Sequence, residues 1–165
     1  MRAMWGIHSD KPRFDFVSGE FIALGWSRLG DLRGIGDDQE AIKAALATAY
    51  PEARRRAIPV WAGMLRRFAF EMAPGDIVVH PHKPDSTLCF GRVRSEYRWE
   101  PDAPDVRHRR EVTWLHTGVP REAFSKGAGH ELCAAMTLFR VRRHAQEFFD
   151  RLALVPPAAD TARAG

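Results

Sequence analysis

Apolar residues gather in two short runs that turn-forming residues separate. The run Ile77–Val79 follows the turn Pro74-Gly75-Asp76, and a second run from Leu88 to Tyr97 begins nine residues later along the chain. The β-branched run Ile77–Val79 predicts a buried strand, and the second segment predicts another strand from its apolar positions, which are Leu88, Phe90, Val93 and Tyr97. The intervening segment His80–Asp85 contains two prolines, which cannot donate to a strand ladder. We therefore expect a hairpin with a long polar loop, which forms the lip of a binding site on a small β-barrel.

Three further segments have the pattern of strands. They are Ala3–Ser9, Phe21–Trp26 and Val106–Trp114, each bounded by glycine, proline or aspartate. The segment Ser27–Gly36 contains three glycines, which predicts an irregular loop.

Helical spacing dominates the intervals between the strands. A capping box at Asp37–Glu40, with Asp37 as the cap, begins a helix that ends before Pro51. A second helix begins near Pro59. Its expected apolar face consists of Val60, Trp61, Met64, Leu65, Phe68 and Met72. Further helices are predicted at Gly129–Met136 and Arg142–Leu154.

About five strands interrupted by helices in an irregular order predict an α+β fold, a small mixed β-barrel with flanking helices. A regular βαβ alternation, and with it a doubly wound sheet, is missing from the pattern. Residues 1–155 are expected to form one domain, and the Ala- and Pro-rich residues 156–165 a disordered tail or linker.

The composition is that of a globular protein without a membrane span. The 165 residues are 45% hydrophobic and 28% charged, which is ordinary for a globular domain. The sequence has neither an apolar stretch long enough to span a membrane nor the pattern of a signal peptide, so we expect a cytoplasmic protein. Cys89 and Cys133 are expected to be buried thiols.

The charge favours a polyanionic partner. The net charge is +4, and most of the 25 basic residues are arginine, whose planar donor fork suits phosphate oxygens. Three arginine groups stand out, and the sequence leaves open whether they share a face. They are Arg54–Arg56; Arg107, Arg109 and Arg110; and Arg140, Arg142 and Arg143.

The sequence offers no pattern typical of a catalytic or metal centre. His80 and His82 flank Pro81, and no third ligand follows at motif spacing, so we expect no metal and no other cofactor. Cys89 lies between apolar neighbours, where it acts as a small apolar residue. No serine stands in a nucleophile elbow.

The five tryptophans are more informative. Trp61 and Trp114 are expected in the core. Trp26 ends a strand after Gly25 and precedes a polar loop, a position from which an indole can offer its face to a base. Trp26 as a pocket wall and Trp26 as a core residue remain equally open, and Trp5 has a weaker claim to the pocket.

Several segments together resemble a known family. MWGIH, FIALGWSRLGDL, PGDIVVHPHKPDSTLCFGRV and HRREVTW are similar to the EVE-like branch of the PUA superfamily, over roughly residues 3–150. In particular they resemble the modified-base-sensing domain at the N-terminus of Mrr-type and related restriction endonucleases. The most specific parts are the strand end at Gly25-Trp26 and the Pro-Gly-Asp hairpin.

The resemblance implies a non-enzymatic reader of DNA that contains cytosine modified at C5, by methyl or hydroxymethyl. The modified base would flip out of the duplex into an aromatic pocket, and a separate nuclease domain or partner would supply cleavage in a restriction system that defends against phage. Carried onto this chain, the implied pocket residues are Trp26, His8, Ser9, Gly25, Asp31 and Trp5. The implied contacts to the nucleic-acid backbone are His80, Lys83, Ser86, Arg109 and Arg110.

Three alternatives remain. The same fold could read a modified base in RNA. The related ASCH branch includes small hydrolases and nucleases, for which Lys83 and Asp85 are the nearest candidate pair. A domain whose exposed arginines bind another protein is the third.

Overall fold

The computed structural model describes residues 2–9 and 15–153, so the expected tail at 156–165 lies outside the described residues. The described strands are β1 (Met4–Ile7), β2 (Phe21–Leu24), β3 (Ile77–His82), β4 (Thr87–Val93), β5 (Arg98–Trp99), β6 (His108–Val119) and β7 (Leu138–Val141). The α-helices are α1 (Phe16–Gly19), α2 (Leu32–Ile35), α3 (Gln39–Ala49), α4 (Ala57–Arg66), α5 (Lys126–Glu131) and α6 (Ala145–Leu152). The 3₁₀ turns are η1 (Ser27–Leu29) and η3 (Arg121–Ala123), and η2 (Arg67–Glu71) is π-helical.

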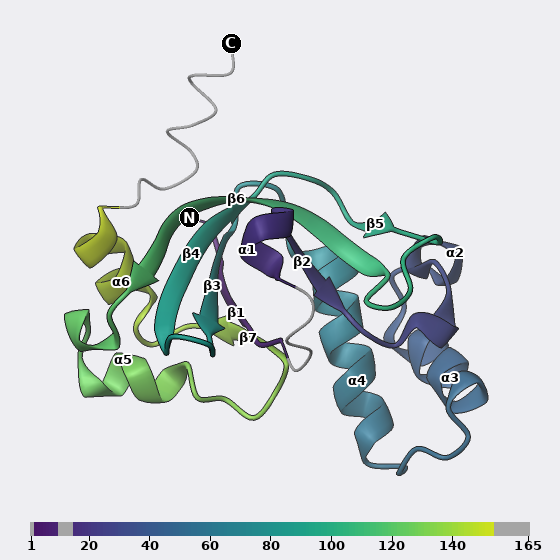
Figure 1. Ribbon diagram of the computed structural model, residues 1–165. Coiled ribbons are helices and arrows are strands. Elements are labelled where there is room, and N and C mark those ends of the chain that lie inside the picture. The colour runs from purple at the N-terminus through teal and green to yellow at the C-terminus, as the bar shows by residue number, and fades with distance from the viewer. Residues whose placement is uncertain (1, 10–14, 154–165) are drawn as a thin grey trace.

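The described strands form one sheet in the order β2-β6-β4-β3-β1-β7, with β5 paired to β6. β1 and β3 are parallel, whereas β1 and β7, β3 and β4, and β4 and β6 are antiparallel. The sheet curls strongly into a half-barrel, with α3 and α4 on one side and α5 and α6 on the other (Figure 1). Register shifts between β4 and β6 supply part of this curvature. The α+β class with a barrel-like sheet is as expected at this level.

The central strand β3 is apolar because both of its faces are buried. Val78 belongs to the core cluster that contains Phe68 of η2, whereas Ile77 and Val79 belong to the cluster that contains Phe148 of α6. Alternate side chains of a strand point to opposite faces, so a continuous apolar run is what a doubly covered strand requires.

The Pro-Gly-Asp turn anchors the first strand to the third. The Asp76 carboxylate accepts hydrogen bonds from the Ala3 amide at 3.3 Å, the Ala73 amide at 3.0 Å and the Trp5 indole N–H at 3.0 Å. Both Asp76 and Trp5 are buried. The motif therefore fixes the position of β1 within the sheet, and the pocket described below begins directly after β1.

The hairpin loop between β3 and β4 is shorter than the sequence predicted. β3 continues through Pro81 to His82, which pairs with Thr87 of β4, so the turn spans residues 83–86. Proline is tolerated here because the pairing of β3 with β1 extends only as far as Val79. Beyond that point β3 is paired on one side, and a missing N–H on the other side costs little.

The expected helices also need correction in detail. Asp38, not Asp37, is the cap of α3 and accepts from the amides of Glu40 and Ala41, whereas Asp37 pairs with Arg66. Val60 is 46% exposed rather than part of the apolar face of α4. The predicted helix at 129–136 begins and ends earlier, as α5, and the loop at 27–36 contains η1 and α2.

Two short strands were not predicted, and one cysteine is placed differently. β5 and β7 lie in segments with no clear strand pattern. Cys89 is buried as expected, but Cys133 is exposed. None of the helices in the described ranges combines the length and the apolar character that crossing a membrane requires.

Candidate functional site

A pocket opens where the end of β1, the end of β2 and the start of β7 approach one another. Its volume is about 180 Å³. A cavity of about 150 Å³ accommodates a benzene ring, so this one has the size for a single aromatic ring. The lining residues are His8, Ser9, Phe16, Ala23, Leu24, Gly25, Trp26, Val106 and Thr137.

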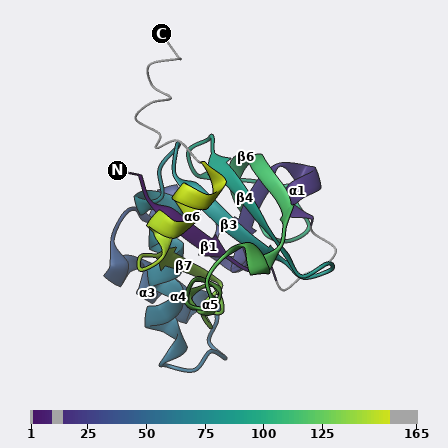
Figure 2. The same cartoon turned by 90° about the vertical axis from the view of Figure 1, so that its left-hand side faces the viewer.

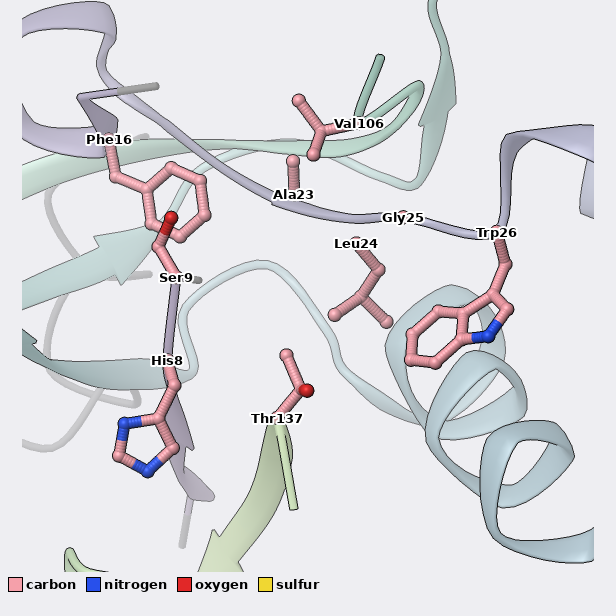
Figure 3. Close-up of a pocket in the computed structure, with 9 residues that line it drawn as sticks. All are labelled: His8, Ser9, Phe16, Ala23, Leu24, Gly25, Trp26, Val106 and Thr137. Carbon is pink, nitrogen blue, oxygen red and sulfur yellow. The ribbon is translucent and has the colours of Figure 1, made fainter. Parts of the chain in front are cut away.

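Figure 3 shows how the walls are distributed. His8, Ser9 and Thr137 lie on one side, and Leu24 and Trp26 lie opposite them. Phe16, Ala23 and Val106 form a third side. The lining is therefore mostly apolar, with hydroxyl groups of Ser9 and Thr137 on one wall, which is the usual composition of a site that binds a flat ligand and fixes its orientation.

The wall formed by His8 is held by backbone contacts. The His8 amide donates to the Thr137 carbonyl at 2.9 Å, which joins the end of β1 to the residue before β7. The His8 ring lies 5.5 Å from the Phe139 ring, centroid to centroid, and in Figure 3 it points away from Trp26. His8 therefore borders the pocket with its main chain rather than presenting its imidazole to the centre.

Trp26 has a left-handed backbone, with φ 57° and ψ 42°. A bulky side chain in this region is an outlier that costs on the order of 1–3 kcal/mol and persists only when neighbouring contacts impose it. Such residues cluster at binding and catalytic sites. The left-handed turn ends β2 abruptly and lets the indole lie against the Trp61 ring at 5.6 Å, on the side of α4.

His108 and Tyr97 impose this conformation through a chain of hydrogen bonds. The Trp26 carbonyl accepts from His108 Nε2 at 3.0 Å, and His108 Nδ1 lies 2.7 Å from the Tyr97 hydroxyl. The Tyr97 oxygen accepts from the Leu32 amide at 3.2 Å. Because a carbonyl can only accept, Nε2 carries the proton, so Nδ1 accepts from the Tyr97 hydroxyl. The neutral His108 tautomer with its proton on Nε2 therefore gives every group in this series of hydrogen bonds a partner.

Burial keeps His108 neutral. It lowers the pKa of His108 to about 4, against the opposing effects of the Trp26 carbonyl and the charge of Asp31. Burial also raises the pKa of Tyr97 to about 12. Both groups therefore remain uncharged near neutral pH, which is the state that the hydrogen-bond chain requires.

Four of the six pocket residues suggested by the sequence line one cavity: His8, Ser9, Gly25 and Trp26. The expectation for Trp5 is wrong, since its side chain is 1% exposed and bonded to Asp76 inside the core. Asp31 does not line the pocket either. It caps α2 and pairs with Arg33, which holds the pKa of Asp31 below its usual value.

Two of the residues expected to contact a nucleic-acid backbone are buried. Arg110 is 0% exposed, and its guanidinium donates to the carbonyls of Phe68, Ala69, Met72 and Ser95. His80 is 6% exposed and donates from Nδ1 to the Ile7 carbonyl at 2.9 Å. Burial lowers the pKa of His80, which favours the neutral ring. These expectations are therefore wrong, because both side chains are buried and donate hydrogen bonds to backbone carbonyls inside the protein.

The other three backbone candidates remain accessible. Lys83 and Ser86 are exposed on the turn between β3 and β4, where the Ser86 carbonyl accepts from Arg121. The Arg109 guanidinium lies 4.3 Å from the centre of the Phe21 ring, and its Nε donates to the carbonyl of the pocket residue Val106 at 3.0 Å. Arg109 is thus half-buried at the pocket rim.

Potential metal ligands and the loop carboxylate of Asp85 bear on the alternative of an enzyme. The described residues contain no group of three or more His, Cys, Asp or Glu side chains that could hold a metal ion. The Asp85 carboxylate accepts from the Thr87 hydroxyl at 2.7 Å and lies 3.0 Å from His82 Nδ1, and these contacts lower the pKa of Asp85 to about 2. A carboxylate used in this way closes the turn and is a poor general base.

The sequence did not indicate several residues of the site. Phe16, Val106 and Thr137 line the pocket, and His108 and Tyr97 support Trp26. His108 begins the segment HRREVTW, but no role followed for it from the sequence, and the other four residues stand outside the motifs of the resemblance. Leu24 was in principle recognisable, as it stands in the same strand directly before Gly25-Trp26. Thr137 was not recognisable, because β7 itself was not predicted.

One comparison with known proteins gives a match. A family model described as a domain of unknown function (DUF8426) matches residues 5–142, a range that includes every residue named above as lining the pocket. Neither the curated proteins nor the solved structures give a match.

Proposed function

We propose that this chain, which belongs to the DUF8426 family of unknown function, reads a C5-modified cytosine in DNA by accepting the flipped base into the pocket at Trp26. The observation that carries the proposal is a ring-sized apolar pocket whose principal aromatic wall is held in a strained conformation. The half-barrel is compatible with the EVE-like fold, and the sequence resemblance adds the expectation of a base as ligand.

The energetics of the pocket suit a base that has left the stack. Extruding a base from a duplex costs a few kcal/mol. Stacking on an aromatic side chain returns about 1–3 kcal/mol, and Trp26 is the residue placed to provide it. Hydroxyl groups of Ser9 and Thr137 stand opposite, where hydrogen bonds to the edge of the base add to the binding energy.

The apolar third side suits a substituent at C5. Phe16, Ala23 and Val106 offer no strongly polar atom on their side chains, so a methyl group there would be removed from water. One methyl-sized group in an apolar pocket contributes about 1–3 kcal/mol, or roughly 10- to 200-fold in discrimination. We therefore expect modified cytosine to bind more tightly than cytosine by a factor in this range.

The activity is binding without cleavage, and cutting of DNA would come from a nuclease domain or partner. This follows from the resemblance. It is supported by the position of His8, the histidine that lines the pocket, whose ring points away from Trp26 and lies against Phe139.

The proposal is tested by titrating matched duplexes that carry one cytosine, C5-methylcytosine or C5-hydroxymethylcytosine, with the wild-type chain and two variants. Trp26→Ala should abolish the preference for the modified duplex, and Trp26→Phe should retain part of it, because a smaller ring still stacks. Equal affinity for all duplexes in the wild type would contradict the proposal. A matched single-stranded RNA series shows whether RNA is the preferred nucleic acid instead.

A further inference from the structure

A second cleft lies at the opposite end of β1 and β7 from the pocket, beside α6. It is lined by three arginines, Arg2, Arg140 and Arg142, together with Gln146, and Met4 and Phe149 form its apolar floor; its volume is about 260 Å³. Figure 2 shows this side of the molecule, with α6 lying beside β1 and β7 near the start of the described chain. Arg140 and Arg142 lie two residues apart at the end of β7, and the pairing of β1 with β7 brings Arg2 to them from the start of the chain.

Contacts to the protein hold the side chains of Arg2 and Arg140 and the backbone of Arg142. Arg2 donates to the Pro74 carbonyl at 3.1 Å, and the Arg140 guanidinium lies 5.3 Å from the centre of the Trp5 ring. The backbone amide of Arg142 donates to the Glu131 carboxylate at 2.7 Å, which fixes the start of the turn after β7. The side chains of Arg2 and Arg140 are thus already ordered, and ordered side chains lose less entropy when they bind a ligand.

The charge of the cleft is strongly positive. No acidic side chain is among the described residues that line it. Glu71 approaches Arg140 only to 4.0 Å, the outer limit of an ion pair. Glu131, just outside, is engaged by the backbone amides of Arg142, Arg143 and His144. Arginine forks bind phosphate oxygens in pairs of parallel hydrogen bonds, so the ligand that this cleft suits is a phosphate group.

We propose that this arginine cleft binds the phosphate backbone of the DNA whose base enters the pocket. The inference rests on the proposed function in one respect, namely that the phosphates belong to DNA. Met4 lines the cleft and His8 lines the pocket, four residues further along β1 and the chain that follows it. At about 3.3 Å per residue this is roughly 13 Å, or about four nucleotide steps along one strand of a duplex.

The cleft also supplies contacts to the nucleic-acid backbone that the sequence had assigned to other residues. Arg110 and His80 lie in the core, so neither of them reaches a nucleic-acid backbone. The arginine cleft supplies replacements on the edge of the sheet formed by β1 and β7.

The test measures affinity for an unmodified duplex over a series of salt concentrations. Arg142→Gln, and the double variant Arg2→Gln with Arg142→Gln, should lower the slope of log K against log salt by about one for each phosphate that the variant no longer binds. Arg142→Lys should restore most of the slope, because it keeps the charge. Arg151→Gln is the matched control: it makes the same change of charge on an exposed position of α6 outside the cleft, and it should leave the slope unchanged.

Equal slopes for Arg142→Gln, the double variant and Arg151→Gln would overturn the proposal, since the cleft would then make no contact to phosphate. The result separates the cleft from the pocket. Variants of the cleft should keep the preference for modified cytosine. If the wild type shows no such preference but the cleft variants still lower the slope, phosphate binding by the cleft is supported and base binding in the pocket is contradicted.

Discussion

Trp26 is held in an unfavourable backbone conformation by two buried polar side chains that lie outside the lining of the pocket. His108 donates to its carbonyl, and Tyr97 fixes the tautomer of His108. Neither His108 nor Tyr97 lines the pocket, so both act on a bound base only through the position of Trp26. The buried hydrogen bonds offset a local strain of about 1–3 kcal/mol.

The neutral state of His108 predicts a pH dependence of stability. Its pKa falls from 6.5 to about 4 on folding, so between these pH values the unfolded chain binds more protons than the folded one. The free energy of unfolding should therefore fall as the pH is lowered through this window, by up to about 3 kcal/mol, and should be independent of this group above it. Urea unfolding at a series of pH values measures the change.

The contribution of His108 is isolated with two variants. His108→Gln should be less stable at pH 7 but should show a flatter dependence between pH 6.5 and 4, as one group with a lowered pKa is gone. His130→Gln, at an exposed position of α5, should keep the wild-type dependence. Identical pH profiles for His108→Gln and the wild type would show that His108 is already charged in the folded protein.

Tyr97→Phe tests the second member of the chain of hydrogen bonds. Removing the hydroxyl leaves the Leu32 amide and His108 Nδ1 without their partner inside the protein, which should cost about 1–3 kcal/mol of unfolding free energy. Tyr50→Phe is a suitable control, since the Tyr50 hydroxyl accepts a solvent-exposed bond from the Arg28 amide. A cost for Tyr97→Phe no greater than that for Tyr50→Phe would mean that the Tyr97 hydroxyl does not support Trp26.

At the scale of elements, one arginine joins a helix to a strand. Arg110 of β6 donates to the carbonyls of Phe68 and Ala69 within η2 and of Met72 just after it. The end of a helix leaves carbonyls without partners inside the helix, and here a buried guanidinium satisfies them. The packing of η2 against the sheet thus depends on a residue that the sequence suggested as a DNA contact.

Arg110→Gln should lower the unfolding free energy by about 3 kcal/mol or more, since it leaves buried carbonyls unpaired. Arg110→Lys should recover only part of the stability, as an ammonium group reaches fewer carbonyls. Denaturant unfolding measures both. In the folded fraction the salt dependence of DNA binding should match the wild type, and a reduced slope would mean that Arg110 contacts phosphate after all.

Strong periodicity made some elements predictable. The spacing of Ile42 and Leu46 in α3, and of Leu65 and Phe68 in α4 and η2, follows the face that is buried. Two elements escaped detection: β5 has only two residues, and β7, although as long as β1 and β2, follows a predicted helix without a turn signal that would mark a new strand. Asp37 and Asp38 are equivalent caps by composition, and only the path of the chain decides between them.

The same limit applies to the site. Gly25-Trp26 was recognisable because the tryptophan ends a strand and precedes a polar glycine loop. The burial of Arg110 and Trp5, in contrast, depends on partners such as Met72 and Asp76, which are distant in the sequence. An arginine in the sequence indicates a positive charge but not where that charge lies on the folded protein. Which arginines share a surface became clear only from the pairing of β1 with β7.

At the scale of the whole molecule, the curl of the sheet brings together the strand ends that line the pocket. β2 and β1 are separated in the sheet by β6, β4 and β3, yet the ends of both line one cavity because the half-barrel brings them round toward each other (Figure 1). Gly91 assists the curl, because a Cβ there would overlap the side chains of Val112 and Trp114 on β6. The pocket and the arginine cleft then lie at the two ends of one edge.

Entry of the modified base into the pocket is tested most directly by photo-crosslinking from the C5 position of the base itself. A duplex with one 5-iodocytosine at the target position would be irradiated in complex with the protein, and the crosslinked peptide would be identified by mass spectrometry. We expect attachment within the pocket, at Phe16 or Val106 on the side that receives the C5 substituent, or at Trp26, on which the base stacks. The crosslink should disappear when excess C5-methylcytosine duplex competes. Crosslinks to surface positions such as Lys83 or α3 would contradict base entry, because the base would then remain outside the pocket.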